Sequence, residues 1–299
     1  MTAYSAIDLS QLPAPSVIEA LDFETILAEM LADLRARHPA YTAIVESDPA
    51  YKVLEVAAFR ELLIRQRVND GARAVMLAYA KGSDLDHIGA NYDVERLMID
   101  PGDADAVPPV PATYESDEEF RRRIQLSPEG YTTAGSEGSY VFHALGAAGD
   151  VKDAQAVSPL PGHVTVYVLS RTGDGTAPAG LLDEVDRALN KETVRPMTDN
   201  VAVQSATIVD YAVAAELVMY PGPDSEVVRQ NAVAALQRYV DGVHRIGYDV
   251  TLSGVYAALH QPGVQRVNLA SPAANIIIDD GEASYCTSIT VTVAGAADV

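Results

Sequence analysis

The six histidines are the residues most suited to bind a metal or transfer a proton, and they are scattered along the chain. No two lie four residues apart, and no His-Glu-x-x-His pattern occurs, so nothing places two imidazoles on one helix face. Cys286 is the sole cysteine, which excludes an intrachain disulfide and a cysteine-based zinc site. We therefore expect no metal centre and no cofactor. The histidines stand at positions 38, 87, 143, 163, 244 and 260.

The sequence motifs of phosphate-binding and calcium-binding loops are incomplete in this chain. Residues 135–138 and 173–175 are glycine-rich but lack the lysine of a phosphate-binding loop, so both are predicted to be turns. Residues 84–86 and 279–280 hold neighbouring aspartates without the alternating acids and terminal glutamate of a calcium loop. A pair of carboxylates that hydrolyses sugars stays open, because the sequence does not give distances in space. No pattern selects a catalytic residue.

The composition favours an assembly protein over a nucleic-acid binder. The chain has 299 residues, 48% of them hydrophobic and only 6% aromatic, which predicts aliphatic cores in two or three compact units. Its 42 acidic and 21 basic residues give a formal charge of −21, which disfavours a polyanion partner. No apolar stretch approaches the roughly 18–20 residues that span a bilayer, and residues 1–11 do not resemble a signal peptide. We expect a soluble protein with no membrane or nucleic-acid partner.

Residues 1–98 are predicted to form a helical N-terminal region. Asp22 precedes one helical pattern, and Ser47-Asp48-Pro49 starts a second pattern expected to run to Ala80. This second helix is longer than a small domain needs, and its apolar positions cover more than one stripe. Either it is buried inside one domain, or it packs against a partner chain. Gly82 is expected to end it, and Ser83 with Asp86 to cap a short helix that follows.

The remaining chain is predicted as a Pro-rich linker at 99–114, a central α+β domain at 115–205 and a C-terminal α+β domain at 206–299. Ser116 and Glu119 have capping-box spacing at the start of the central domain. Strands are expected at 151–157, 164–169, 207–220, 264–269, 275–278 and 288–293.

A weak internal repeat links the two predicted domains. Val151, Ala154 and Ser158-Pro159 are matched 113 residues later by Val264, Val267 and Ser271-Pro272. A helix precedes each copy and a β-type run follows it. The fold class is therefore α+β, with a helical N-terminal region followed by two related small α+β domains.

Four stretches, in their order and spacing, resemble the baseplate J proteins of contractile phage tails. The first is Gly-Ser-Asp-Leu-Asp-His-Ile-Gly at 82–89, with Arg96 shortly after it. The second is the acidic cap and Phe-Arg-Arg-Arg-Ile within 115–124. The third is 131–154, and the fourth is Val-Arg-Pro-Met-Thr-Asp at 194–199. Gly-Val-Gln-Arg-Val at 263–267 also fits.

The resemblance implies a structural wedge subunit that makes and breaks no bond. Two copies would join one copy of a second wedge protein through N-terminal helices. Wedges would close into a ring around the hub and spike proteins, with C-terminal domains joining neighbouring wedges. The ring would relay the contraction signal to the sheath through a sheath-initiator-type protein. Assembly would occur in the bacterial host cytoplasm, and the chain would then be part of a virion or of a headless bactericidal tail.

Five residues are predicted as interface candidates on this basis. In the long helix they are Leu54, Ala58 and Leu62. Arg121 lies in a run of three arginines, for which ion pairs within the helix are favoured over a bridge to another subunit. Arg195 is expected to anchor a turn before the strand at Val201, with contact to a neighbouring chain as the alternative.

Two other functions are kept for comparison. A tail-associated cell-wall hydrolase would need an acid pair that the sequence does not reveal. A host-receptor module would be expected to be richer in β-strand than this chain. The structural interpretation is favoured over both.

Overall fold

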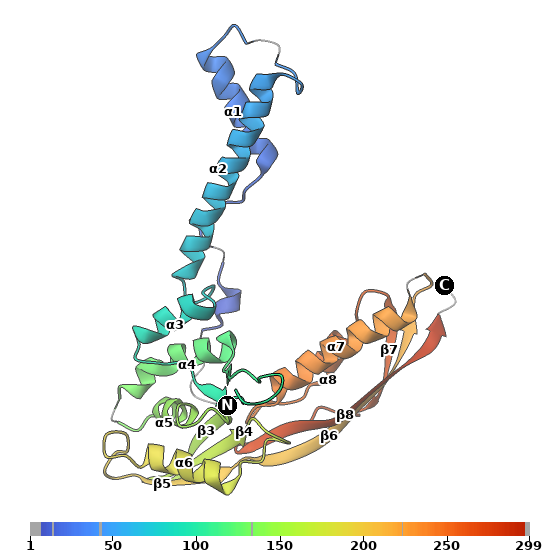
Figure 1. Cartoon of the computed structure of the whole chain (residues 1–299). Helices are drawn as coiled ribbons and strands as arrows, with labels where there is room; N and C mark the ends of the chain where they lie inside the picture. The colour runs from blue at the N-terminus through green and yellow to red at the C-terminus, as the bar shows by residue number, and fades with distance from the viewer. Residues whose placement is uncertain (1–6, 14, 42–43, 133, 223, 297–299) are drawn as a thin grey trace. The chain divides into compact units, whose positions relative to one another are not determined.

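The computed structural model describes residues 7–13, 15–41, 44–132, 134–222 and 224–296. Two compact units are present: a helical unit over Ile7–Glu95 and an α+β unit that begins at Arg96 (Figure 1). Among the described residues, no helix has both the length and the apolar character needed to cross a membrane.

The helical unit contains η1 (Leu9–Gln11), α1 (Phe23–Arg37), α2 (Pro49–Ala74) and α3 (Gly82–Ala90). Both predicted helix starts are confirmed. The Asp22 carboxylate accepts from the Thr25 amide at the start of α1, and the Asp48 carboxylate accepts from the Ala50 amide at the start of α2. These short-range bonds satisfy amides that have no partner inside the helix.

The α1–α2 pair holds together through a small apolar core. Ile26, Leu27 and Ala58 are buried between the two helices, and half-buried apolar side chains surround them. Asn69 of α2 adds a polar clamp, because its side chain exchanges hydrogen bonds of 3.1 and 2.9 Å with the backbone of Glu19. The segment before α1 is thereby fixed to α2.

The end of α2 differs from the prediction. The helix ends at Ala74 and is 26 residues long, and turns follow up to Tyr79 instead of helix up to Ala80. Bonds such as Met76 N to Arg73 O tighten the chain here, and Ala80 becomes buried. The 3₁₀-type bonds of this turn replace the helical bonds that a continuous helix to Ala80 would make.

The predicted cap of the following helix is also wrong. Gly82 is the first residue of α3 and does not end the preceding helix. Lys81 occupies the N-cap position without a side-chain bond, so the expected Ser83–Asp86 capping box does not start this helix. The φ of +50° at Gly82 explains why glycine suits the position.

The α+β unit opens with β1 (Met98–Asp100) and β2 (Thr113–Tyr114), which pair antiparallel within the segment predicted as a linker. Two helices follow, α4 (Asp117–Gly130) and α5 (Glu137–Leu145). The capping box of Ser116 and Glu119 is confirmed, and Ser136 caps α5. α4 includes Pro128 near its end.

The central sheet has the order β3-β4-β5, formed by β3 (Val151–Leu160), β4 (His163–Ser170) and β5 (Asn200–Ser205). β3 and β4 are antiparallel, whereas β4 and β5 are parallel. Helix α6 (Ala179–Leu189) provides the connection that parallel strands require. α5 packs on β3, α6 packs against β5, and the two helices contact each other. The core lies between these helices and the sheet.

The C-terminal sheet has the order β7-β6-β8, formed by β6 (Thr207–Met219), β7 (Val264–Ser271) and β8 (Glu282–Ala296). Helices α7 (Ser225–Val243) and α8 (Leu252–Leu259) run along one face of the sheet and bury a second core against it (Figure 1). The strand predicted at 275–278 is wrong, because only a single bridge between Val250 and Ile276 forms there. β8 begins at Glu282, six residues before the predicted start at Ser288.

The internal repeat corresponds to a shared sheet pattern. β3 and β7 each follow a helix pair, lie at a sheet edge and run antiparallel to a middle strand. The other neighbour of that middle strand is parallel in both sheets. The connectivity differs, because the middle strand β4 follows β3 whereas the middle strand β6 precedes α7. The predicted domain boundaries at 98, 114 and 205 stay a proposal.

The two sheets meet at a short junction. Only Ala206 separates β5 from β6, and it is buried with Leu169, Ile246 and Ala283. Side chains of β3 reach across the junction as well. Gln155 exchanges two hydrogen bonds of 2.7 Å with residues 280 and 281, and the Asp153 carboxylate accepts from the Ile246 amide at 3.1 Å.

Gly149 tests how tightly the β1–β2 ribbon packs on the central core. A Cβ at this position would overlap the backbone carbonyl of Met98 in β1. We expect Gly149→Ala to lower the free energy of unfolding by about 1–3 kcal/mol, measured by urea denaturation, because a strand backbone cannot move aside. Gly180→Ala is the matched control, since its Cβ meets nothing within 4 Å. Equal stability of both variants would contradict this packing.

Candidate assembly surface and charge network

Helix α2 has a second apolar face. Six large apolar side chains on it are each between 44% and 68% exposed. At 100° per residue Val53, Val56, Leu63 and Ile64 point away from the buried Ala58, which faces α1, and the other two lie at the edges of this side. Contiguous exposed apolar residues of this kind make the face a candidate for contact with another chain. We call it the outer α2 face; its apolar residues are Val53, Val56, Phe59, Leu63, Ile64 and Val68.

The three predicted interface residues in α2 lie on the opposite side. Ala58 is fully buried, and Leu54 and Leu62 are half-buried against the same small core. Within this chain that stripe is therefore already covered by α1. Their contact with a partner chain remains a prediction. The outer α2 face belongs to the apolar positions that the sequence predicted outside a single stripe, but none of its residues was among the predicted interface residues.

The arginine run at 121–123 forms long-range ion pairs. Arg122 contacts Asp153 of β3 at 3.0 Å, and Arg123 contacts the buried Glu115. The expectation of pairs within the helix is wrong for these two arginines, because both carboxylates lie outside α4. Arg121 is half-buried, and its predicted role at an interface stays a prediction.

Arg195 lies in the turn before β5. Its Nη1 donates to the Asp199 carbonyl oxygen at 3.0 Å, while the Asp199 carboxylate accepts from the Tyr140 hydroxyl at 2.7 Å. Burial, followed by Asp199, raises the pKa of Tyr140, so this hydroxyl stays a donor. The turn-anchor interpretation of Arg195 fits this geometry, and contact with a neighbouring chain remains a prediction.

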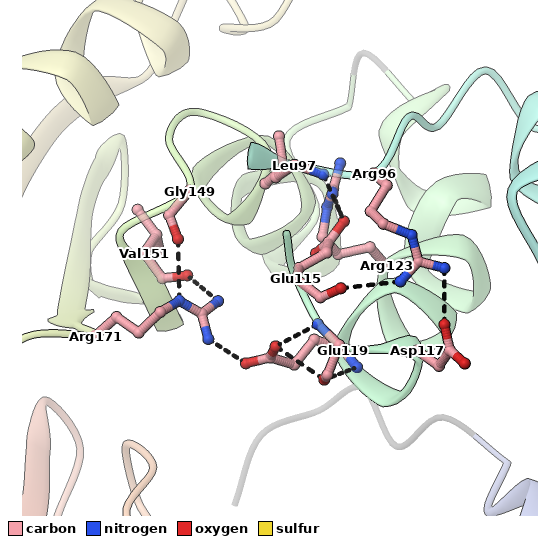
Figure 2. A network of polar contacts seen from close by, with 10 residues as sticks. Arg96, Leu97, Glu115, Asp117, Glu119, Arg123, Gly149, Val151 and Arg171 are labelled. Atoms are coloured by element: carbon pink, nitrogen blue, oxygen red, sulfur yellow. Dashed lines mark hydrogen bonds and ion pairs between the residues drawn. The ribbon is translucent and has the colours of Figure 1, made fainter. Parts of the chain in front are cut away.

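A charge network centred on Glu115 joins the start of the α+β unit to α4 (Figure 2). One oxygen of the buried carboxylate, Oε1, accepts from both the Leu97 amide and the Arg123 guanidinium. Arg96 donates to the Glu115 carbonyl at 2.9 Å and to Asp117 at 2.8 Å, and its guanidinium lies over the Phe120 ring. The chain is thereby held at its first residue after the helical unit.

Glu119 extends the network to the central sheet (Figure 2). Its carboxylate accepts from the Ser116 amide and from the Arg171 guanidinium. Arg171, just after β4, also donates to the Gly149 and Val151 carbonyls. One side chain thus caps α4 and bridges it to the end of β4 and the start of β3.

The two ion pairs differ electrostatically. Burial raises the pKa of Glu115 and lowers the pKa of Arg123, so desolvation outweighs the attraction within that pair. Burial acts in the same direction on Glu119, but the hydrogen bond and charge of Arg171 with the Ser116 bonds hold its pKa below the ordinary value. The outer ion pair, Glu119 with Arg171, therefore stabilises the fold when it is charged. The inner ion pair, Glu115 with Arg123, mainly fixes the position of α4 against the segment that contains Leu97.

Among the described residues, no group of three or more His, Cys, Asp or Glu side chains is placed to hold a metal ion. A shallow, open hollow of about 290 Å³ lies on the C-terminal sheet, lined mostly by alanines and threonines of β6, β7 and β8.

Comparison with known proteins assigns the family. Three models match in order: the Baseplate J-like N-terminal domain at 46–103, the central domain at 132–205 and the C-terminal domain at 211–292. The chain belongs to the baseplate J-like family. Its relatives include baseplate protein J of Escherichia phage P2, 52% identical over 296 residues that cover 97% of this chain and 98% of the relative.

A solved structure is also similar at a distance. The baseplate J-like chain matches a chain in the cryo-EM structure of the anti-feeding prophage baseplate, 6-fold symmetrised, at 16% identity and a TM-score of 0.38. The match covers 62% of this chain and 44% of that one. The resemblance predicted from the motifs is therefore confirmed by the family models and the phage relative.

Glu119→Gln tests the outer ion pair through its pH dependence. The lowered pKa means that the carboxylate stabilises the fold above its ordinary value of 4.5 and loses this effect as the pH falls. We expect the variant to be less stable by on the order of 1 kcal/mol at pH 7, with the difference shrinking below about pH 4.5. Urea unfolding of both proteins from pH 3 to 8 measures it. A difference independent of pH would show that the charge is irrelevant.

Proposed function

We propose that this chain is a non-catalytic structural subunit of the baseplate of a contractile phage-type tail. Two copies join a second wedge protein through their helical units. Such wedges close into a ring around the hub, and the ring relays the contraction trigger to the sheath.

The outer α2 face carries this proposal. It exposes six large apolar side chains on one helix, and apolar area of this kind is buried when chains associate. The phage P2 relative, named baseplate protein J, matches along almost its whole length and supports a baseplate role. A stable contact of this type buries more than about 1,000 Å².

The charge network supports the relay. Arg96 is the first residue after the helical unit and is bonded to Glu115 and Asp117. A movement of the chain at Arg96 would therefore move α4 through these bonds. The bond between Glu119 and Arg171 would pass the movement on to the start of β3 and the end of β4.

Sedimentation of the purified chain, alone and with the tail proteins encoded beside it, tests the function. We expect a defined complex with at least one of those proteins. A chain that stays monomeric in every mixture would refute the proposal, and turnover in a peptidoglycan-clearing assay would favour the hydrolase instead.

Paired substitutions on the two faces of α2 separate assembly from folding. Val56→Asp with Ile64→Asp places charges on the outer α2 face, where both side chains are exposed. We expect assembly to be lost while the far-UV circular dichroism is unchanged. Leu54→Asp with Leu62→Asp places charges against the α1–α2 core and should unfold this helix pair as well. If the outer variant still assembles, this face is not the contact.

A further inference from the structure

The outer α2 face carries two arginines at a regular interval. Val53, Arg60 and Arg67 are seven residues apart, and Val56 and Leu63 fall between them, so the face has alternating three- and four-residue steps. This is the spacing of a coiled coil, in which Val53, Arg60 and Arg67 would occupy a positions and Val56 and Leu63 would occupy d positions. Both arginines are exposed.

Neither arginine is neutralised within the described part of the chain. Arg60 and Arg67 form no ion pair there, although neighbouring cations on α2 do. Lys52 pairs with Glu55 at 2.9 Å, and Arg65 pairs with Glu61 at 2.5 Å. Asp70, the acid nearest to Arg67 along the helix, instead contacts Arg73 and Gln66.

Two positive charges on an apolar face are unexpected in a chain with a formal charge of −21. At seam positions of a helix pair they face whatever covers the helix. If that were α2 of a second copy in parallel register, Arg60 would face Arg60 and Arg67 would face Arg67. In an antiparallel pair a positions face d positions, so Arg60 would face Leu63 and Arg67 would face Val56, and each charge would be covered by an apolar side chain. Neither arrangement gives the arginines an opposite charge: the parallel pair opposes like charges, and the antiparallel pair covers the charges with apolar groups.

We propose that the outer α2 face is covered by an acidic amphipathic helix of a different polypeptide, and that Arg60 and Arg67 select this helix over α2 of a second copy. The inference rests on the proposed function and adds the chemistry of the partner. The fitting helix has carboxylates seven residues apart with large apolar residues between them. Two copies of this chain then meet through that helix instead of meeting face to face.

Two synthetic helical peptides test the selection on the full-length chain. Both have leucine at the d positions; one has glutamate and the other lysine at the a positions. We expect the glutamate peptide to bind about tenfold or more tightly than the lysine peptide in calorimetric titration, with the difference reduced by salt. In the variant Arg60→Glu with Arg67→Glu the preference should reverse. Equal binding of the two peptides to the wild type would overturn the proposal.

Self-association provides the second measurement. Arg60→Leu with Arg67→Leu removes the charges and should make the chain dimerise in sedimentation, whereas we expect the wild type not to associate through this face. Adding Val56→Asp and Ile64→Asp to the leucine variant is the control and should restore the monomer. A wild type that dimerises through the outer α2 face as readily as the leucine variant would overturn the proposal.

Mixing with the neighbouring tail proteins separates the two proposals. If Arg60→Glu with Arg67→Glu joins them as tightly as the wild type does, the charge selection is refuted and the structural function stands. If no tail protein joins the wild type, the structural function fails, and the peptide titration still decides the charge selection.

Discussion

The architecture of the α+β unit depends on a carboxylate that is costly to bury. Glu115 is removed from water together with Arg123, and desolvation exceeds their mutual attraction. The pair instead fixes the position of two segments. Because one Glu115 oxygen accepts hydrogen bonds from both Arg123 of α4 and the Leu97 amide, the segment around Leu97 is held against α4. Removing either Glu115 or Arg123 would leave the other charge buried without a partner, so the local fold needs both residues.

Helix α2 shows how one helix serves two purposes. One stripe, with Ala58 at its centre, stabilises the helical unit against α1. The other leaves apolar side chains and two arginines in water. A helix with apolar residues on both sides is unfavourable for a monomer and favourable for an assembly intermediate. The acidic remainder of the chain keeps such an intermediate soluble until the contact forms.

Local rules predicted much of the fold, and long-range contacts explain the rest. The caps at Asp22 and Ser116 follow from side chains three residues from the amides that they satisfy, which a sequence displays directly. The partner of Arg122 lies 31 residues away, and no local signal marks the turn that ends α2 at Ala74. For the same reason the sequence could list both apolar stripes of α2 but could not say which one α1 covers.

Ala206 alone joins β5 to β6, and Gln155 bonds across to residues 280 and 281. A connection this short contains no slack, and it is clamped on a second side by side chains of β3. Both features restrict bending between the two sheets at this junction. A change in the tilt of the central sheet would therefore have to break these hydrogen bonds or be followed by the C-terminal sheet.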